Sequence, residues 1–237
     1  MKPKERLIVA LDVDTLEGAL ELVETLSPVV DIFKVGIAPF TAFGHELLEK
    51  INELDKKVFL DLKVHDIPNT VRNAAYAAAK KGVFMMNFHC LGGESMLQAA
   101  AEGAEEAALR LHKPGPLLLG VTILTSMSQD DMQSIGITGS VEEKVLDLAL
   151  KAYNAGLNGV VASAKEASSI KDKFGEKFIV VTPGIRPEWA AKGDQKRVLT
   201  PKEATMAGAD YIVVGRPIIE ADDPALAAEK IIKEIAG

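Results

Sequence analysis

Short apolar runs alternate with stretches of helical spacing along the whole chain, and this alternation limits the possible folds more than any other feature. Eight runs predict β-strands, at residues 7–11, 32–35, 58–62, 84–88, 117–123, 159–161, 178–181 and 211–214. Nearly all of them lack the polar alternation of a one-sided sheet. They therefore predict parallel strands that are covered on both faces.

The stretches between these runs predict helices, at 16–26, 42–54, 69–81, 95–111, 140–155 and 224–235. Gly82 and Gly156 follow two of them as stop signals. Eight βα units predict an α/β fold, a (β/α)8 barrel or TIM barrel, and 237 residues suit a single domain spanning 1–237. A doubly wound open sheet is the alternative, but the first strand ends in Leu11-Asp12-Val13-Asp14, without the glycines common in such sheets.

The composition argues against several classes of function. A net charge of -7 disfavours nucleic acid or an anionic membrane as a main partner, although a local basic site can still bind a phosphorylated small molecule. Cys90 is the only cysteine, so no internal disulfide and no cysteine-built zinc site is expected. The sequence shows neither a signal-peptide region nor an apolar run of the roughly 18 residues that span a membrane. We therefore expect a cytoplasmic protein.

Polar residues gather where the predicted strands end. Active sites of barrels form from the loops at the carboxyl ends of the strands, so residues at these ends are expected to share one face. Lys34 lies within an apolar run and needs a counter-charge, which Asp61 on the next strand can supply. A lysine that reaches solvent at the barrel rim is the alternative. The strand ends carry Asp12, Lys34, Asp61 with Lys63, His89, Thr122 with Thr125, Ser163, Pro183 to Arg186, and Gly215 with Arg216.

The most specific chemistry lies in the run from residue 59 to residue 71. Asp61 and Lys63 are two positions apart on a strand and project to the same side, and Asp66 follows just past the strand end. With Lys34 they predict an array of alternating charge that holds a protonated lysine in a fixed place. Such a cation can stabilise a developing carbanion and then protonate it. An ordinary ion pair at a strand edge is the alternative.

The last two strands predict a phosphate site. Gly215 allows backbone N–H groups to approach a ligand, Arg216 offers a forked donor, and phosphate sites in barrels often follow strands seven and eight. From Arg186 to Val198 the chain is polar, is interrupted by Pro and Gly, and contains the only tryptophan, Trp189. We interpret this segment as a lid over a phosphorylated substrate, with an ordinary surface loop as the alternative.

On these motifs the chain closely resembles the orotidine 5'-monophosphate decarboxylases, in their bacterial stand-alone form. The resemblance runs almost from end to end and implies a (β/α)8 barrel that works as a homodimer with shared active sites, without a cofactor or a metal. The implied reaction releases CO2 from orotidine monophosphate and gives UMP, the last step of de novo pyrimidine synthesis. The stretches that carry the resemblance are Asp61-Leu62-Lys63-Val64-His65-Asp66-Ile67-Pro68-Asn69-Thr70-Val71, Thr182-Pro183-Gly184-Ile185-Arg186 and Val213-Val214-Gly215-Arg216.

The resemblance also implies roles for individual residues. Lys63 would donate a proton to C6 after CO2 leaves, Asp61 would lie beside the scissile carboxylate, and Asp66 would reach into the neighbouring subunit's site. The implied substrate-binding residues are Asp12 and Lys34 at the ribose, Thr70 at the ribose across the interface, Thr125 at the pyrimidine edge, Arg186, Gln195, Gly215 and Arg216 at the phosphate, and Ile67 and Pro183.

Two other functions remain open at this point. The magnesium-dependent 3-keto-gulonate 6-phosphate decarboxylase and its hexulose-phosphate synthase relatives share the charged triplet but use an acidic residue on strand two as a metal ligand. Here that position is Lys34, a cation that would repel Mg2+. The second possibility is an inactive nucleotide-binding protein, against which the intact Asp61, Lys63 and Asp66 argue.

Overall fold

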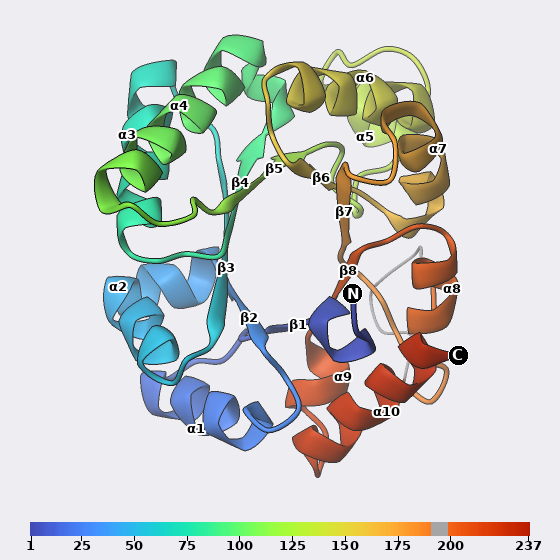
Figure 1. Ribbon diagram of the computed structural model, residues 1–237. Coiled ribbons are helices and arrows are strands. Elements are labelled where there is room, and N and C mark those ends of the chain that lie inside the picture. Colours follow the sequence, from blue (N-terminus) through green and yellow to red (C-terminus); the bar gives the residue numbers. More distant parts are fainter. Residues whose placement is uncertain (191–198) are drawn as a thin grey trace.

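Eight parallel strands close into a barrel, each pairing with the next in the chain and β8 pairing with β1 (Figure 1). The structure is a computed structural model that describes residues 1–190 and 199–237. The closed barrel confirms the predicted fold and is not the alternative open sheet. The strands are β1 (Leu7–Ala10), β2 (Ile32–Gly36), β3 (Lys57–Val64), β4 (Met85–His89), β5 (Leu117–Val121), β6 (Gly159–Val161), β7 (Ile179–Thr182) and β8 (Tyr211–Val214).

Helices surround the barrel on the outside (Figure 1). Several begin at a capping box, as at Ser140, whose hydroxyl accepts from the N–H of Glu143 while the Glu143 carboxylate accepts from the N–H of Ser140. Within the described ranges, no helix is both long and apolar enough to cross a bilayer. The helices are α1 (Leu16–Leu26), α2 (Ile37–Glu53), α3 (Pro68–Lys80), α4 (Glu94–Leu111), α5 (Gln129–Ser134), α6 (Val141–Asn154), α7 (Ala164–Phe174), α8 (Pro201–Met206), α9 (Arg216–Ile219) and α10 (Pro224–Ala236), with 3-10 turns η1 (Pro3–Arg6) and η2 (Cys90–Gly92).

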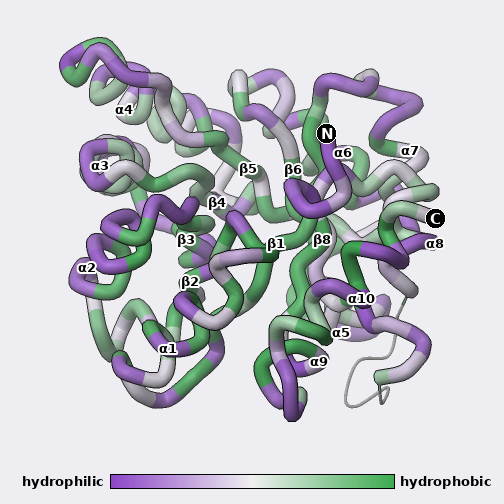
Figure 2. The backbone as a smooth tube through the Cα atoms, turned by 60° about the horizontal axis from the view of Figure 1, so that its bottom comes forward, coloured by the Kyte–Doolittle hydropathy of each residue, from purple (hydrophilic) through white to green (hydrophobic). Residues whose placement is uncertain are grey.

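Two apolar layers pack on either side of the sheet. The outer layer joins one face of each strand to the helices, as where Val9 and Leu11 of the first βα unit pack with Val23 of α1. The inner layer fills the barrel with side chains of the strands alone. The tube along β1 and β8 is coloured mostly as hydrophobic (Figure 2). The strands are thus buried on both faces, which explains their continuous apolar runs. The inner layer consists of Ile8, Ala10, Ile32, Phe59, Met85, Leu119, Val181, Tyr211 and Val213.

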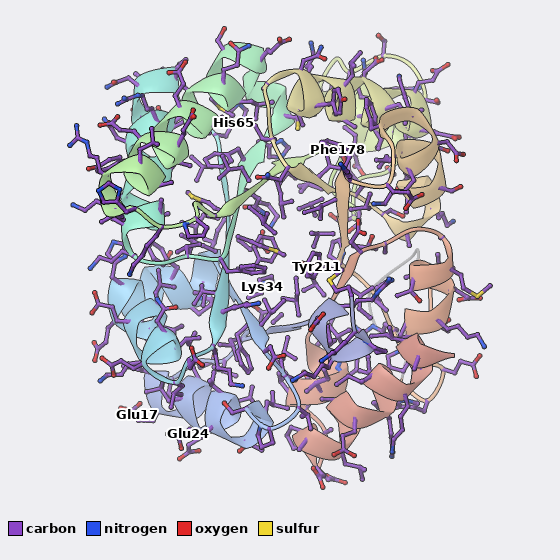
Figure 3. The ribbon with its side chains drawn as sticks, viewed as in Figure 1. Glu17, Glu24, Lys34, His65, Phe178 and Tyr211 are labelled. Atoms are coloured by element: carbon purple, nitrogen blue, oxygen red, sulfur yellow. The ribbon has the colours of Figure 1, made fainter. Side chains whose placement is uncertain are left out.

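The strand period of two places polar side chains directly above this inner layer. Lys34, Asp61 and Asn87 each stand two residues after an inner-layer residue, so they too point into the barrel. Lys34 lies toward the barrel centre, whereas Glu17 and Glu24 of α1 lie on the outer rim (Figure 3). The interior therefore changes from apolar to charged at the carboxyl ends of the strands.

The structure departs from the sequence-based prediction at three elements near the site. Strand β5 ends at Val121, two residues earlier than predicted. Strand β3 continues to Val64, and its register with β4 shifts between Leu60 and Val64, where Lys63 has a left-handed φ of 50°. Helix α2 begins at Ile37, five residues earlier than predicted, and contains a kink at Gly44 with φ of 59°. A glycine adopts that φ without steric cost, so the helical stretches on either side of Gly44 can follow each other directly.

Candidate active site

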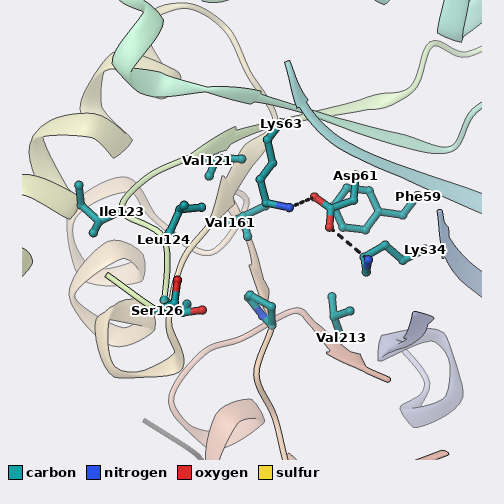
Figure 4. A pocket seen from close by; sticks show the side chains of 12 residues that line it. Lys34, Phe59, Asp61, Lys63, Val121, Ile123, Leu124, Ser126, Val161 and Val213 are labelled. Atoms are coloured by element: carbon teal, nitrogen blue, oxygen red, sulfur yellow. Dashed lines mark hydrogen bonds and ion pairs between the residues drawn. The ribbon is translucent and has the colours of Figure 1, made fainter. Parts of the chain in front are cut away.

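A cavity of 320 Å3 opens at the carboxyl ends of the strands (Figure 4). Phe59 and Val213 of the inner layer line its apolar part, together with Val161 of β6, which packs against that layer. Lys34, Asp61 and Lys63 supply charge on one side. The remaining lining residues come mostly from the β5 end and the loop after it: Val121, Ile123, Leu124, Thr125 and Ser126, together with Pro183. The cavity therefore offers an apolar surface on which a flat ring can pack, with charged side chains along one side.

A second cavity of 170 Å3 adjoins the first and shares Lys34, Pro183 and Val213 with it. It is lined further by Asp12 and by the residues that follow β7 and β8, including Gly184, Arg186, Gly215 and Arg216. Two arginines and a glycine turn meet here, as the predicted phosphate site requires. The two cavities together form an elongated site with Lys34 at their junction.

Four side chains of alternating charge connect the two cavities. The Asp61 carboxylate lies 2.7 Å from the Lys63 ammonium and 3.4 Å from the Lys34 ammonium, and Lys34 lies 3.6 Å from Asp12. The first two contacts are drawn in Figure 4. The predicted pairing of Lys34 with Asp61 is thereby confirmed. Asp12 extends the predicted array beyond Lys34, whereas Asp66 does not join it within the described chain.

Asp61 remains ionised despite its burial. Its side chain is 12% exposed, and burial acts to raise its pKa. The opposing effects of the Lys34 and Lys63 ammonium groups, with hydrogen bonds from Lys63 and Asn87, hold the pKa of Asp61 below its usual value. A negative charge therefore stands fixed beside the Lys63 ammonium at neutral pH.

The sequence-based prediction overlooked Asn87. Its side chain is fully buried on β4, accepts a hydrogen bond from the Lys63 backbone N–H at 2.7 Å and donates one to the Asp61 carboxylate at 2.6 Å. The available signal was a single amide residue inside the apolar strand Met85–His89. A buried amide needs partners, so that pattern could have suggested a bonding role.

Three of the predicted residues lie outside both cavities in the described chain. Asp66, Ile67 and Thr70 are exposed, and the Asp66 carboxylate accepts a hydrogen bond from the Ile67 N–H. No ion pair joins Asp66 to Lys63 within the described chain. Gln195 and residues 191–198 of the predicted lid lie outside the described residues.

Two histidines stand near these charged side chains without lining either cavity. The rings of His65 and His89 lie 5.6 Å apart. Burial, and then the neighbouring His65 and Lys63, lower the pKa of His89, so it is neutral at neutral pH. Among residues 1–190 and 199–237, no cluster of three or more His, Cys, Asp or Glu side chains could hold a metal ion.

Comparison with known proteins gives one consistent result. Residues 5–231 match the family described as "Orotidine 5'-phosphate decarboxylase / HUMPS family". A protein of Carboxydothermus hydrogenoformans named orotidine 5'-phosphate decarboxylase is 51% identical over 233 residues, which cover 98% of this chain and 97% of that protein. One of the same name from Moorella thermoacetica is 48% identical over 236 residues, covering 99% of this chain and 94% of that protein.

A solved structure agrees with these sequence relatives. The crystal structure of orotidine 5'-phosphate decarboxylase from Lactobacillus acidophilus superimposes with a TM-score of 0.85 at 38% identity, covering 98% of this chain and 100% of that chain. That protein is thus similar to this chain in fold and sequence over its whole length.

Proposed function

Since the chain belongs to the orotidine 5'-phosphate decarboxylase / HUMPS family, we propose that Lys63 protonates the carbanion formed when this enzyme decarboxylates orotidine 5'-monophosphate to UMP. The family and the named relatives support decarboxylation of that substrate, in pyrimidine biosynthesis. We further propose that the chemistry uses side chains alone, without a cofactor or a metal.

The single observation that carries the mechanism is the Lys34–Asp61–Lys63 array in a cavity whose other lining residues are mostly apolar. Loss of CO2 from C6 leaves an electron pair in the plane of the ring, where the π-system cannot delocalise it. The Lys63 ammonium is already in place to stabilise that charge, because Asp61 holds it there before the substrate binds. The ammonium then transfers a proton to C6, and one N–H bond is exchanged for the new C–H bond.

The neighbouring cavities suit the two ends of the substrate. The pyrimidine would occupy the larger cavity, with Thr125 at its polar edge. The ribose would lie at Lys34 and Asp12, and the phosphate at Arg186, Gly215 and Arg216 in the smaller cavity. Binding energy from the remote phosphate would then help to hold the reacting carboxylate at Asp61. Pro183 lines both cavities and would contact the substrate where they meet.

We propose that the active sites are completed by a second copy of the chain, in a homodimer of single-domain barrels located in the cytoplasm. Asp66, Ile67 and Thr70 form an exposed stretch between β3 and α3, and Ile67 is 66% exposed. An exposed isoleucine beside an acidic and a hydroxyl side chain suits an interface better than open solvent. In this arrangement Asp66 would approach the partner's Lys63, and Thr70 the partner's ribose.

A direct assay tests the function and its independence from metals together. Purified protein in excess EDTA is expected to convert orotidine monophosphate to UMP, which is followed by the loss of substrate absorbance. The sister reaction would instead require activity on 3-keto-gulonate 6-phosphate once Mg2+ is restored. Activity on that substrate and none on orotidine monophosphate would refute the proposed function.

Mixing two inactive variants tests the shared site. Lys63→Ala and Asp66→Ala are each expected to be inactive as homodimers. A heterodimer restores one complete site, so random mixing of chains should recover about a quarter of the wild-type activity. The activity is measured after the two variants are unfolded and refolded together, and each variant refolded alone is the control. Absence of recovery in a mixture that forms heterodimers would show that each site belongs to one chain.

A further inference from the structure

We infer that Asn87 is a positioning residue for the decarboxylation, because its side chain fixes both Asp61 and the backbone of Lys63 in one geometry. This inference rests on the proposed function. It concerns a residue that lines neither cavity and so acts on the substrate only through its two partners.

The orientation of the Asn87 amide follows from its partners. The Lys63 N–H can only donate, and it lies 2.7 Å from the Asn87 oxygen. The ionised Asp61 carboxylate can only accept, and it lies 2.6 Å from the Asn87 nitrogen. Interchanging the oxygen and nitrogen would place the amide NH2 against the Lys63 N–H, two donors, and the amide oxygen against the Asp61 carboxylate, two acceptors. The partners therefore specify the orientation of the amide.

The backbone of Lys63 needs such support. A non-glycine residue at a φ of 50° is strained, and such strain persists only where the surroundings hold it. The regular ladder does not do so here, because the register between β3 and β4 shifts across Lys63. The Asn87 side-chain oxygen accepts a hydrogen bond from the Lys63 N–H at this interruption of the ladder.

The second bond fixes the charge beside the ammonium. Asp61 Oδ1 accepts from both Asn87 and the Lys63 ammonium, while Oδ2 faces Lys34. Asn87 therefore restrains the rotation of the carboxylate that orients the proton donor. Asp61 and Lys63 of β3 are hydrogen-bonded to Asn87, and Lys34 pairs with the other oxygen of Asp61. On β4, His89 stands two residues after Asn87, and on β5 the residue paired with Asn87 is Leu119.

Asn87→Ala tests this inference because it removes both bonds. We expect kcat to fall by about 10- to 100-fold, the usual effect of losing a partner that orients a reacting group, with the Kd for UMP changed by less than about threefold. Asn158→Ala is the matched control. The Asn158 oxygen also accepts from a strand N–H, that of Leu118 at 2.8 Å, but it lies outside both cavities. That variant is expected to keep the wild-type kcat.

Asn87→Asp separates positioning from a purely structural role through the pH profile of kcat. The new carboxylate still accepts from the Lys63 N–H but opposes Asp61, so the two acids share one proton up to a raised pKa. In that singly protonated form, both the hydrogen bond and the wild-type charge are restored. The kcat of this variant should therefore recover toward the wild-type value as the pH is lowered from about 8 to about 6.

The outcomes distinguish this inference from the proposed function. Wild-type turnover of orotidine monophosphate tests the function, whereas the ratio of variant to wild type tests Asn87. A folded Asn87→Ala variant with kcat within threefold of the wild type would overturn the inference, as would a loss of UMP binding equal to the loss of kcat. If that variant does not fold, Asn87→Asp decides: an acid-side recovery supports positioning, and a profile parallel to the wild type refutes it.

Discussion

Replacing Lys63 with Ala is expected to lower kcat by about 10⁴-fold or more while the enzyme still binds UMP. The substitution removes the proposed proton donor and the positive charge proposed to stabilise C6, two contributions that multiply. Product binding is expected to persist because the residues proposed to hold the phosphate and ribose line the smaller cavity, which Lys63 does not line. Single-turnover kinetics with orotidine monophosphate and the Kd for UMP measure the two effects separately.

Lys81→Ala is a suitable control for this experiment. Lys81 forms an ion pair with Glu49 at 2.6 Å, a distance close to that of Lys63 and Asp61, but it lies outside both cavities. Its replacement should leave kcat unchanged. Near-normal turnover by the Lys63 variant would show that another group protonates C6.

Replacing Asp61 with Asn is expected to lower both activity and stability. The amide keeps the shape of the side chain but leaves the Lys34 and Lys63 ammonium groups without their common counter-charge. We expect kcat to fall by about 10³-fold, because Lys63 loses the group that fixes its position. The free energy of unfolding should fall by about 3 kcal/mol, as for a broken buried ion pair, since Lys34 retains Asp12.

The pH dependence of this loss has a definite sign. The folded protein holds the pKa of Asp61 below its usual value, so ionised Asp61 stabilises the fold above the pKa of the unfolded chain, about 3.9. That contribution disappears as the pH falls through the lower, folded value. The stability difference between wild type and Asp61→Asn in urea should therefore be full at pH 7 and shrink below about pH 4.

Asp147→Asn provides the comparison for stability. Asp147 pairs with Lys144 at 3.3 Å on the surface and is 60% exposed, so its loss should cost less than about 1 kcal/mol at any pH. Equal effects of the two substitutions would mean that the Asp61 array contributes no more than an ordinary surface pair.

The barrel could be predicted from the sequence because burial on both faces leaves a plain pattern. A strand such as Leu7–Ala10 has every residue buried, and eight such runs separated by helical spacing admit few topologies. The period of two likewise predicts that Asp61 and Lys63 project to the same side. The pairing of Lys34 with Asp61 could be predicted because a charge within an apolar run needs a counter-charge.

The remaining features depend on contacts that no local pattern specifies. Nothing in the sequence around Lys63 indicates a left-handed backbone, because the side chain that holds it, Asn87, lies on another strand. Helix α2 is kinked at Gly44, and a glycine inside a helical pattern has several possible meanings, so the kink could not be predicted. The exposed Asp66 acquires the predicted role only beside a second chain, so a single chain cannot test it.

The layered interior of the barrel also separates the charge of the site from the fold. Lys34 stands between Asp12 and Asp61 at the junction of the two cavities, two residues after Ile32 of the apolar layer. Its ammonium neutralises two carboxylates that would otherwise offer Mg2+ the hard oxygen donors that it prefers. Position 34 therefore sets the charge at this point of the site, while the apolar layer beneath specifies the barrel independently of that charge.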